Sequence, residues 1–386
     1  MPPGRPSLRL VEADDPGLPT AVARALDGGA PLSVLPTDPV AAARTRTALR
    51  PSEPVVEEDA ALLLPTSGST GEPKVVVLSA AAVRASVAAT SARTGAPGSW
   101  ALALPVSGVA GLMVVARAAL TGATLHRVPA DLADPALTPV GDGPHHLSVV
   151  PTQLHRVRDD PAALERLARY DTVLVGGAAT DGTLLAALRQ HGVPLVTTYG
   201  MSETCGGCVY DGRPLDGVAV TCDPADQRIR ITTPTAFSGY RGRPDLTAEV
   251  LVGPGTVLTA DRGRLADGRL QVLGRLDDVV VSGGSNVDLA LVEGVLRELL
   301  GTDQVAVTSA PDPEWGARVV AVLAAPAPDV DLEHLRGLLR PRTDPAALPK
   351  QLLRVPVLPL LPGGKTDRVA LRATASHPDH VLPEVR

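Results

Sequence analysis

Short apolar runs alternate with longer amphipathic segments between residues 60 and 200. The segments at 160–170 and 181–192 carry apolar residues at helical spacing, whereas the apolar runs are continuous and end at Gly, Pro or polar residues. Such runs are typical of strands buried on both faces, and their alternation with helices is typical of βαβ units. The predicted strands are 60–67, 99–106, 146–152, 170–177 and 193–200. We therefore predict an α/β fold whose large N-terminal domain contains parallel sheets and helices.

The pattern changes after residue 201 to short alternating runs separated by turn signals. Asp-Gly pairs at 211–212 and 267–268 favour tight turns with positive φ, so we expect antiparallel hairpins in a β-rich subregion. Further along, apolar runs and helical patterns predict a small α+β domain. Its predicted helices are 287–301 and 331–340, and its predicted strands are 277–284, 304–310, 317–326 and 352–359.

These patterns predict two domains, 1–276 and 277–386, of which the second is small and mobile. The first 59 residues are rich in Pro, Ala and charged residues, with one apolar segment at 29–36. An acidic stretch follows at 51–60. We interpret this region as a short leader that packs on the main domain.

The composition narrows the classes of function. A chain of 386 residues with 44% hydrophobic content can bury one large core and one smaller core. Its net charge of -6 and lack of a long basic run disfavour nucleic-acid binding, which relies on clustered Lys and Arg. Neither a membrane span nor a signal peptide is predicted, and the 3 cysteines fit a reducing compartment. We therefore expect a cytoplasmic protein.

Three predicted strands end in turns rich in small and hydroxyl residues, at 66–74, 175–180 and 198–204. Ligands of open parallel sheets bind beyond the carboxyl ends of the strands, so these turns could face one crevice. Small residues let backbone N–H groups approach an anion, which favours a nucleotide phosphate, although one such loop alone is equally a plain turn. The first turn does not fit the P-loop NTPase pattern, because Lys74 stands three residues after Gly71 and is followed by Val75.

Almost all basic residues of the chain are Arg, and only three are Lys. Two of them, Lys74 and Lys365, stand in glycine-bearing loops, and we interpret Lys350 as an ordinary surface residue. A lysine ammonium is a compact charge that can reach a phosphoryl oxygen, so both loops are candidates for phosphate chemistry.

Four motifs carry a resemblance to a known family. The stretches PTSGSTGEPK, TYGMSET, LGRLDDVVVSGG after Asp261, and LPGGKTDR resemble, in order and spacing, the adenylate-forming acyl-CoA synthetase superfamily. Within it, VPTQL, VLVGGA and TYGMSETCGGCVYDGRPLDGV are most similar to the compact o-succinylbenzoate-CoA ligases of menaquinone biosynthesis in actinobacteria. That closer resemblance covers most of residues 20–372.

The resemblance implies an ATP site. Residues 66–74 would wrap the β- and γ-phosphates, 176–178 would lie along the adenine with Tyr199 stacked on it, and Asp261 would bind the ribose. Glu203 would hold Mg²⁺ and Thr204 would contact the α-phosphate. The residues implied to bind ATP are Thr66, Ser67, Gly68, Ser69, Thr70, Gly71, Lys74, Gly176, Gly177, Ala178, Thr198, Tyr199, Gly200, Met201, Ser202, Asp261 and Arg275.

The resemblance also implies two half-reactions. Lys365 would stabilise the charge that builds as the acid attacks the α-phosphorus, which gives acyl-AMP and pyrophosphate. The small domain would then rotate about Asp277 and present Ser282, Gly283 and Gly284 beside a tunnel for CoA. Thioester formation would expel AMP. The expected partners are a small carboxylic acid, ATP and CoA, and a homodimer is one candidate assembly.

Each assignment has a plainer alternative. Glu203 could be an acid favoured by a helix N-terminus. Asp277 and Asp278 could be surface charges, Asp261 could form an exposed ion pair with Arg262, and Tyr199 could be a core residue. The pair Cys205 and Cys208 could suggest a zinc or redox motif, but no second Cys pair or nearby His completes a zinc site, and we favour a backbone role for the intervening glycines.

One departure from the family pattern concerns the acid. Where these ligases usually carry a second His, the stretch 105–111 has Gly108, which would enlarge the pocket and remove a donor. The predicted function is an o-succinylbenzoate-CoA ligase. The alternatives are an aryl or acyl adenylating ligase of a natural-product pathway and a nucleotide-binding homologue without catalysis. The residues expected to form the acid pocket are Gly108, Val109, Ala110, Gly111, Gly200 and Cys205.

Overall fold

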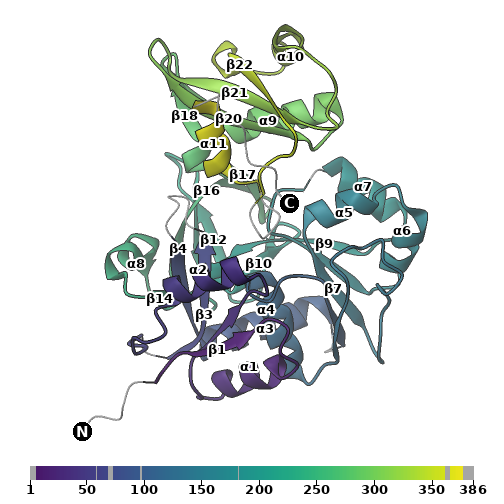
Figure 1. The fold of residues 1–386 in the computed structure, drawn as a ribbon, viewed down its shortest axis with the longest axis vertical. Coiled ribbons are helices and arrows are strands. Elements are labelled where there is room, and N and C mark those ends of the chain that lie inside the picture. Colours follow the sequence, from purple (N-terminus) through teal and green to yellow (C-terminus); the bar gives the residue numbers. More distant parts are fainter. Residues whose placement is uncertain are drawn as a thin grey trace. The chain divides into compact units, whose positions relative to one another are not determined.

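The computed structural model describes residues 6–57, 59–67, 73–95, 98–180, 182–360 and 366–376 (Figure 1). The chain divides into two compact units, and the α/β fold class is confirmed. The predicted boundary between residues 276 and 277 stays a prediction. Among the described helices, none is long and apolar enough to cross a membrane. The N-terminal unit comprises Met1–Thr221, Arg230–Thr259 and Leu265–Leu270, and the C-terminal unit comprises Cys222–Ile229, Ala260–Arg264 and Gln271–Arg386.

The first sheet of the N-terminal unit includes the segment that we interpreted as a leader. Its elements are β1 (Arg9–Glu12), α1 (Leu18–Leu26), β2 (Leu32–Leu35), α2 (Pro39–Leu49), β3 (Ala60–Ser67), β4 (Pro73–Ser79) and β14 (Gly239–Tyr240). The strand order is β1-β2-β3-β4-β14, in which β1, β2 and β3 are parallel while β4 is antiparallel to both neighbours. All four residues of β2 are buried, because Leu32 and Val34 pack in one core cluster and Leu35 packs in another. The leader interpretation is therefore wrong, since this segment is hydrogen-bonded into the sheet.

The second sheet of the N-terminal unit holds the other four predicted strands. Its elements are β5 (Ser99–Leu102), β6 (Leu125–Arg127), β7 (His145–Val149), β8 (Thr172–Val175), β9 (Leu195–Met201), β10 (Gly206–Tyr210) and β11 (Arg213–Pro214). The order is β11-β10-β9-β8-β7-β5-β6, and the five strands from β9 to β6 are parallel. Of the three small-residue turns, the first follows a strand of a different sheet from the other two, because β3 belongs to the first sheet and enters a hairpin with β4.

Helices cover both faces of the second sheet. They are α3 (Ala80–Thr94), α4 (Val109–Thr121), α5 (Pro151–Val157), α6 (Pro161–Leu167) and α7 (Gly182–Gln190). One core cluster joins α1, α3 and α4 to strands of both sheets, and another joins α5, α6 and α7 to β7 and β8. Helix α4 is buried along most of its length, as expected for a helix that is hydrophobic all round. The predicted helices at 160–170 and 181–192 are confirmed.

A third sheet carries the β-rich subregion. Its strands are β12 (Ala219–Cys222), β13 (Arg228–Thr232), β15 (Leu251–Gly253), β16 (Thr256–Ala266) and β17 (Arg269–Arg275), and α8 (Pro244–Val250) precedes β15. The order is β12-β13-β16-β15, with β17 paired to β16. Both predicted Asp-Gly turns are confirmed, with φ of 48° and 75° at Asp211 and Gly212 and of 51° and 69° at Asp267 and Gly268. Gly supplies positive φ without steric cost, and Asp tolerates it.

The C-terminal unit ends in an α+β region. Its elements are β18 (Val279–Ser282), β19 (Ser285–Asp288), α9 (Leu289–Leu300), β20 (Val305–Asp312), β21 (Gly316–Ala324), α10 (Leu332–Leu339), β22 (Gln351–Val355) and α11 (Arg368–Ser376), with short 3₁₀ turns η2 (Leu276–Asp278) and η3 (Pro345–Ala347). The sheet order is β19-β18-β21-β20, and β22 lies parallel to β21. Val305 and Val307 pack toward α9 and α10, whereas Ala306 packs toward α11. This alternation confirms the predicted strands and helices and places a core on each face.

Candidate active site

The loop predicted to bind phosphates connects β3 and β4. Thr66 lies opposite Lys74 in the strand register, and its hydroxyl donates to the Lys74 carbonyl at 3.3 Å. Val75 is buried, so alternation along β4 directs the Lys74 side chain to the other face of the strand. Gly68, Ser69, Thr70 and Gly71 lie outside the described residues, as does the side chain of Ser67. The phosphate role of this loop therefore stays a prediction.

Glu203 lies where β9 ends. The chain leaves β9, passes through the 3₁₀ turn η1 (Ser202–Thr204) and reverses at Cys205, whose φ is 52°, into the antiparallel strand β10. The Glu203 side chain is half-buried, and its Oε1 accepts a hydrogen bond from the Tyr240 hydroxyl at 2.6 Å. The Glu203 carbonyl accepts from the Phe237 N–H at 2.9 Å. Two separate contacts therefore tie the turn after β9 to residues 237–240.

Tyr240 is a site residue that the sequence analysis missed. Strand β14 pairs with β4 so that Tyr240 lies opposite Val76, and its ring packs edge-on against Phe237 with centroids 4.9 Å apart. Lys74 Nζ lies 5.6 Å from the centre of the same ring. Burial, together with the charge and hydrogen bond of Glu203, raises the pKa of Tyr240, so the phenol stays protonated and acts as a donor. A signal existed, since the whole chain has only four tyrosines.

Thr204 and Ser202 differ in their availability to a ligand. Thr204 is fully buried, and its hydroxyl accepts from the Met201 N–H at 3.0 Å and donates to the Gly206 carbonyl at 2.8 Å. Ser202 is half-buried at the start of η1. The geometry thus gives the Thr204 hydroxyl a function inside the turn. The α-phosphate role of Thr204 stays a prediction.

The residues expected to follow the adenine lie on two adjacent strands. Gly176 continues from β8, and a Cβ there would stand 2.2 Å from the Thr198 hydroxyl of β9, so only Gly allows this close approach. Gly177 and Ala178 are exposed. Tyr199 is half-buried within β9, so it is not a fully buried core residue. Exposed backbone after the end of β8, together with a half-buried aromatic residue in the neighbouring strand β9, is compatible with the adenine assignment.

The residues expected to form the acid pocket come together at the start of α4. Gly108 is the N-cap of that helix, and a Cβ on Gly111 would stand 2.3 Å from the Pro105 carbonyl oxygen. A Cβ on Gly206 would come within 3.9 Å of Val109, and one on Gly200 would stand 2.0 Å from the Gly206 carbonyl oxygen. Backbone therefore approaches backbone closely between β9 and β10 and at the start of α4, and the Val109 side chain lies near Gly206.

Cys205 and Cys208 are buried beside this region. Burial raises the pKa of Cys205 far above its ordinary value and, for the most part, raises the pKa of Cys208 to about 11. Both thiols are therefore protonated at neutral pH, and a thiol in that form is a poor nucleophile and metal ligand.

Asp261 has a different partner from the one suggested by its sequence neighbour. Within the C-terminal unit, Asp261 lies 3.3 Å from Arg275, whereas Arg262 pairs with Asp288 at 2.9 Å. The alternative of an exposed Asp261–Arg262 ion pair is therefore wrong, and the Asp261 side chain is only 15% exposed. This pair combines an acceptor for hydroxyl groups with a cation.

Arg275 also holds the predicted hinge residue. Its guanidinium binds Asp277 with two hydrogen bonds of 2.8 and 2.9 Å. Partial burial acts to raise the pKa of Asp277, but the hydrogen bonds and charge of Arg275 outweigh it and lower the pKa below its ordinary value. Asp278 is buried, and mainly for that reason its pKa is raised. The alternative that Asp278 is a surface charge is therefore wrong, and the hinge role of Asp277 stays a prediction.

The predicted CoA loop packs on a tryptophan. Gly283 and Gly284 have φ of 58° and 80°, and a Cβ on Gly283 would stand 2.5 Å from the Trp315 ring. Ser282 is fully buried. Lys350, which we interpreted as an ordinary surface residue, has its Nζ 3.5 Å from the centre of the Trp315 ring. Gly283 is thus required for contact with Trp315, while the CoA role of residues 282–284 stays a prediction.

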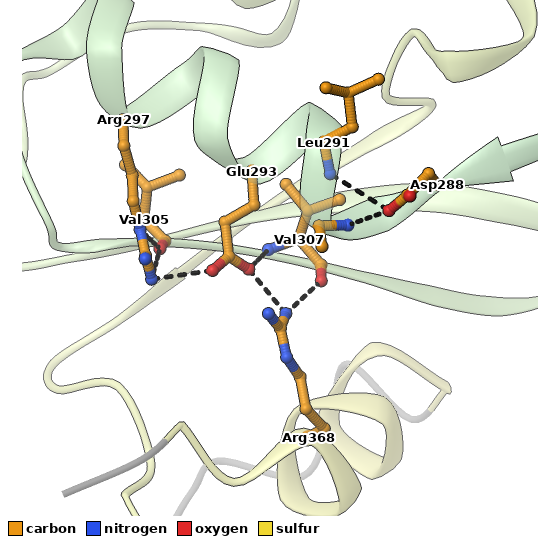
Figure 2. A network of polar contacts seen from close by, with 8 residues as sticks. Asp288, Leu291, Glu293, Arg297, Val305, Val307 and Arg368 are labelled. Atoms are coloured by element: carbon orange, nitrogen blue, oxygen red, sulfur yellow. Dashed lines mark hydrogen bonds and ion pairs between the residues drawn. The ribbon is translucent and has the colours of Figure 1, made fainter. Parts of the chain in front are cut away.

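A polar network anchors α11 in the C-terminal unit (Figure 2). Glu293 of α9 accepts hydrogen bonds from the Val307 N–H at 2.9 Å and from Arg368 at 2.6 Å, and it pairs with Arg297 at 2.8 Å. Arg368 also donates to the Val307 carbonyl at 2.7 Å. Lys365, the predicted catalytic lysine, lies outside the described residues, and α11 begins three residues after it.

The chain belongs to the AMP-binding enzyme family, whose sequence profile matches residues 10–237. Among its relatives is the protein named "Probable 2-succinylbenzoate–CoA ligase" of Mycobacterium tuberculosis, which is 41% identical over 341 residues, or 84% of this chain and 86% of that protein.

Two solved structures share the fold of the whole chain. The o-succinylbenzoate CoA synthetase (MenE) of Bacillus subtilis, in complex with the acyl-adenylate intermediate OSB-AMP, has a TM-score of 0.76 at 21% identity and covers 95% of this chain and 88% of its own. The amide bond synthetase McbA of Marinactinospora thermotolerans has a TM-score of 0.75 at 27% identity and covers 97% of this chain and 90% of its own. At these identities the first likeness concerns the fold alone.

Proposed function

We propose that the chain is an AMP-forming acid–CoA ligase that converts o-succinylbenzoate to o-succinylbenzoyl-CoA through an acyl-AMP intermediate. The observation that carries this proposal is the relative at 41% identity, whose name specifies the same substrate. The product would serve menaquinone biosynthesis in the cytoplasm, where ATP and CoA are available. A homodimer stays a prediction.

In the first half-reaction, a carboxylate oxygen of the acid forms a bond to the α-phosphorus of ATP. The bond from that phosphorus to the bridging oxygen of the β-phosphate breaks, and pyrophosphate leaves with the bonding electrons. Lys365 would stabilise the negative charge that builds on the incoming and leaving oxygens. Thr66–Lys74 would hold the β- and γ-phosphates, and Thr204 would contact the α-phosphate.

The residues present fit a magnesium ion that is bound together with ATP. Mg²⁺ usually takes one or two carboxylates from the protein and completes its octahedron with water and substrate phosphates. Glu203 offers such a carboxylate, and the described residues contain no group of three or more acidic, His or Cys side chains that would bind a metal by themselves. When bound, the ion would neutralise part of the charge on the phosphates.

In the second half-reaction, the CoA thiol attacks the acyl carbonyl carbon, loses its proton, and the bond from that carbon to the AMP oxygen breaks. Rotation of residues 277–386 about Asp277 would exchange Lys365 for the loop 282–284 at the reaction centre. The close packing of Gly283 on the Trp315 ring supports a loop of fixed shape, and the pair of hydrogen bonds from Arg275 supports a defined position for Asp277.

A second candidate is an adenylating ligase of a natural-product pathway that acts on another aryl or acyl acid. Two observations favour keeping it. Gly108 stands where the resembled ligases carry His, and the likeness to an amide bond synthetase extends over 97% of the chain. A third candidate, a nucleotide-binding homologue without catalysis, is disfavoured by the presence of Glu203, Asp261, Arg275 and Lys365 together.

Acid-dependent exchange of radiolabelled pyrophosphate into ATP tests the three candidates. We expect o-succinylbenzoate to drive exchange, and addition of CoA to give the thioester and AMP. A response to substituted benzoates or fatty acids without one to o-succinylbenzoate would favour the natural-product ligase. If no acid supports exchange although the protein binds ATP, the non-catalytic homologue is the correct interpretation.

A further inference from the structure

We propose that Tyr240 is a positioning residue for the AMP-forming reaction, which fixes the Glu203 carboxylate for the metal–nucleotide complex through the hydrogen bond between its hydroxyl and Glu203 Oε1. This inference rests on the proposed function. It concerns a residue that lies outside the matched range 10–237 of the family profile and to which the four sequence motifs gave no role.

The contact is short and directional. The Tyr240 oxygen lies 2.6 Å from Glu203 Oε1, which is the range expected for a hydroxyl that donates to a charged carboxylate. A tyrosine hydroxyl has one hydrogen to donate, so the phenol occupies one lone pair of one carboxylate oxygen. Tyr240 is the one side-chain donor to Glu203 within the part of the chain that the structure describes. The remaining lone pairs are therefore available to a ligand.

The phenol can orient Glu203 because the Tyr240 backbone is itself held firmly. Strand β14 is hydrogen-bonded to β4, with Gly239 opposite Val77 and Tyr240 opposite Val76. The Tyr240 N–H donates to the Thr247 hydroxyl at 2.9 Å, and the ring packs edge-on against Phe237. Only 4% of Tyr240 is exposed. A ring restrained in this way leaves its hydroxyl few positions.

Tyr240 also connects the two sheets of the N-terminal unit at the place where phosphates are proposed to bind. Glu203 follows a strand of the second sheet, whereas Lys74 and Tyr240 belong to the first. Lys74 Nζ lies 5.6 Å from the ring centre, within the distance at which a cation is attracted to an aromatic face. One aromatic ring therefore contacts both the proposed metal ligand and the proposed phosphate-binding cation.

Groups that orient a metal ligand typically change metal affinity about 10–100-fold when they are removed. Tyr240→Phe deletes the hydroxyl and keeps the ring that packs against Phe237 and Lys74. A matched control is Tyr210→Phe, because Tyr210 is also buried and its hydroxyl lies 3.1 Å from that of Thr90, away from Glu203. The two variants lose the same atom in different places.

The test measures Mn²⁺ binding by electron paramagnetic resonance at saturating ATP and without an acid substrate, so that the readout does not depend on turnover. We expect Tyr240→Phe to raise the Mn²⁺ dissociation constant by about tenfold or more, and Tyr210→Phe to leave it unchanged. In the Glu203→Gln background, Tyr240→Phe should not raise the Mn²⁺ dissociation constant further, because the hydroxyl acts through the carboxylate. In pyrophosphate exchange, the Mg²⁺ requirement should rise while the KM for the acid stays constant.

Equal Mn²⁺ affinities of the wild type and Tyr240→Phe would overturn the inference and leave the proposed function intact. So would additive effects of Tyr240→Phe and Glu203→Gln, since they would show that the two residues act separately. Failure of the proposed function has a different signature: the wild type would show no exchange with o-succinylbenzoate, whatever its affinity for Mn²⁺.

Discussion

Two glutamates in this chain, one in each unit, have opposite environments. Glu293 of the C-terminal unit has a side chain that is 6% exposed and is contacted by the Val307 N–H, Arg297 and Arg368 (Figure 2). Glu203 of the N-terminal unit is half-buried and accepts one side-chain hydrogen bond, from Tyr240, among the described residues. A carboxylate whose lone pairs are occupied stabilises a fold, whereas one held at a single oxygen can still bind a ligand.

The two glutamates also differ in whether nearby charges compensate their own. Glu293 lies between two arginines, so its charge is compensated within the protein. Beside Glu203, the neutral phenol of Tyr240 orients the carboxylate without neutralising it. An uncompensated carboxylate favours a cation, and Lys74, whose Nζ lies 5.6 Å from the centre of the Tyr240 ring, favours an anion. A magnesium–phosphate pair carries both charges, and variants of either glutamate can test the contrast.

The largest loss of stability is expected from Glu293→Ala. Removal of one partner from a fully buried ion pair typically costs about 3–5 kcal/mol. We expect the lower end of that range, because the side chains of Arg297 and Arg368 are 32% and 31% exposed. Chemical denaturation followed by fluorescence of the tryptophan in the C-terminal unit, Trp315, measures the free energy of unfolding. The matched control is Glu298→Ala on the same helix, whose pair with Arg342 is exposed and should contribute under about 1 kcal/mol. Equal losses for the two variants would contradict the structural role of Glu293.

Lys365→Ala is expected to have the largest effect on chemistry. Removal of a group that stabilises transition-state charge typically lowers the rate about 10²–10³-fold. Pyrophosphate exchange should fall by that factor, while thioester formation from supplied acyl-AMP should remain close to the wild type. Lys350→Ala is the control, since Lys350 contacts Trp315 in the same unit. A parallel loss in both half-reactions would remove the role of Lys365 as the adenylation lysine.

Glu203→Gln should lower activity and leave stability nearly unchanged, whereas Glu293→Ala should mainly lower stability. The amide keeps the size of the side chain and can accept from Tyr240, so the free energy of unfolding should change by less than about 1 kcal/mol. Metal affinity, and with it exchange at limiting Mg²⁺, should fall about 10–100-fold because the charge of a ligand is lost. Exchange that saturates at the same Mg²⁺ concentration as in the wild type would show that Glu203 is not the metal ligand.

The smallest effect is expected from the pH dependence of stability at Asp277. Arg275 lowers the pKa of Asp277 in the folded state, so its stabilising effect is present above the ordinary pKa of about 3.9 and is lost as pH falls through the folded pKa. Because the pair of Asp277 with Arg275 is exposed, we expect it to contribute under about 1 kcal/mol to the free energy of unfolding. The stability difference between the wild type and Asp277→Asn, measured by urea unfolding, should shrink as the pH is lowered below 4.

Asp278 provides the control of opposite sign, because burial raises its pKa. Ionisation of Asp278 therefore opposes folding, and that cost disappears as the pH falls through the raised folded pKa. The pH dependence of Asp278→Asn relative to the wild type should have the reverse slope. The same slope for both variants would contradict the assigned environments of these two neighbours.

Local signals in the sequence were reliable where the physical cause is local. The Asp-Gly pairs predicted tight turns because two residues with positive φ define them. The helical spacing at 181–192 predicted α7 for a similar reason. By contrast, the residues before 60 looked like a leader because their apolar stretch is short, yet β2 is a buried strand between two neighbours.

The site divides in the same way. The sequence itself marked Glu203, Lys74 and the glycines at 176 and 177 through small residues, a rare lysine and ordered motifs. It could not show that Tyr240 contacts Glu203, because that contact depends on the pairing of β14 with β4. Nor could it show that Asp261 pairs with Arg275 in place of the adjacent Arg262.

The sequence by itself thus determined the alternation of strands and helices in much of the chain after residue 60, the turn chemistry and membership of an AMP-binding family. The tertiary structure alone decided that β3 and β9 lie in different sheets, which residues meet across them, and which of the two glutamates is fully hydrogen-bonded. The physical reason is range. Backbone propensity and turn geometry depend on a few neighbouring residues, whereas strand pairing and the partners of a charge depend on segments that packing brings together from far apart in the chain.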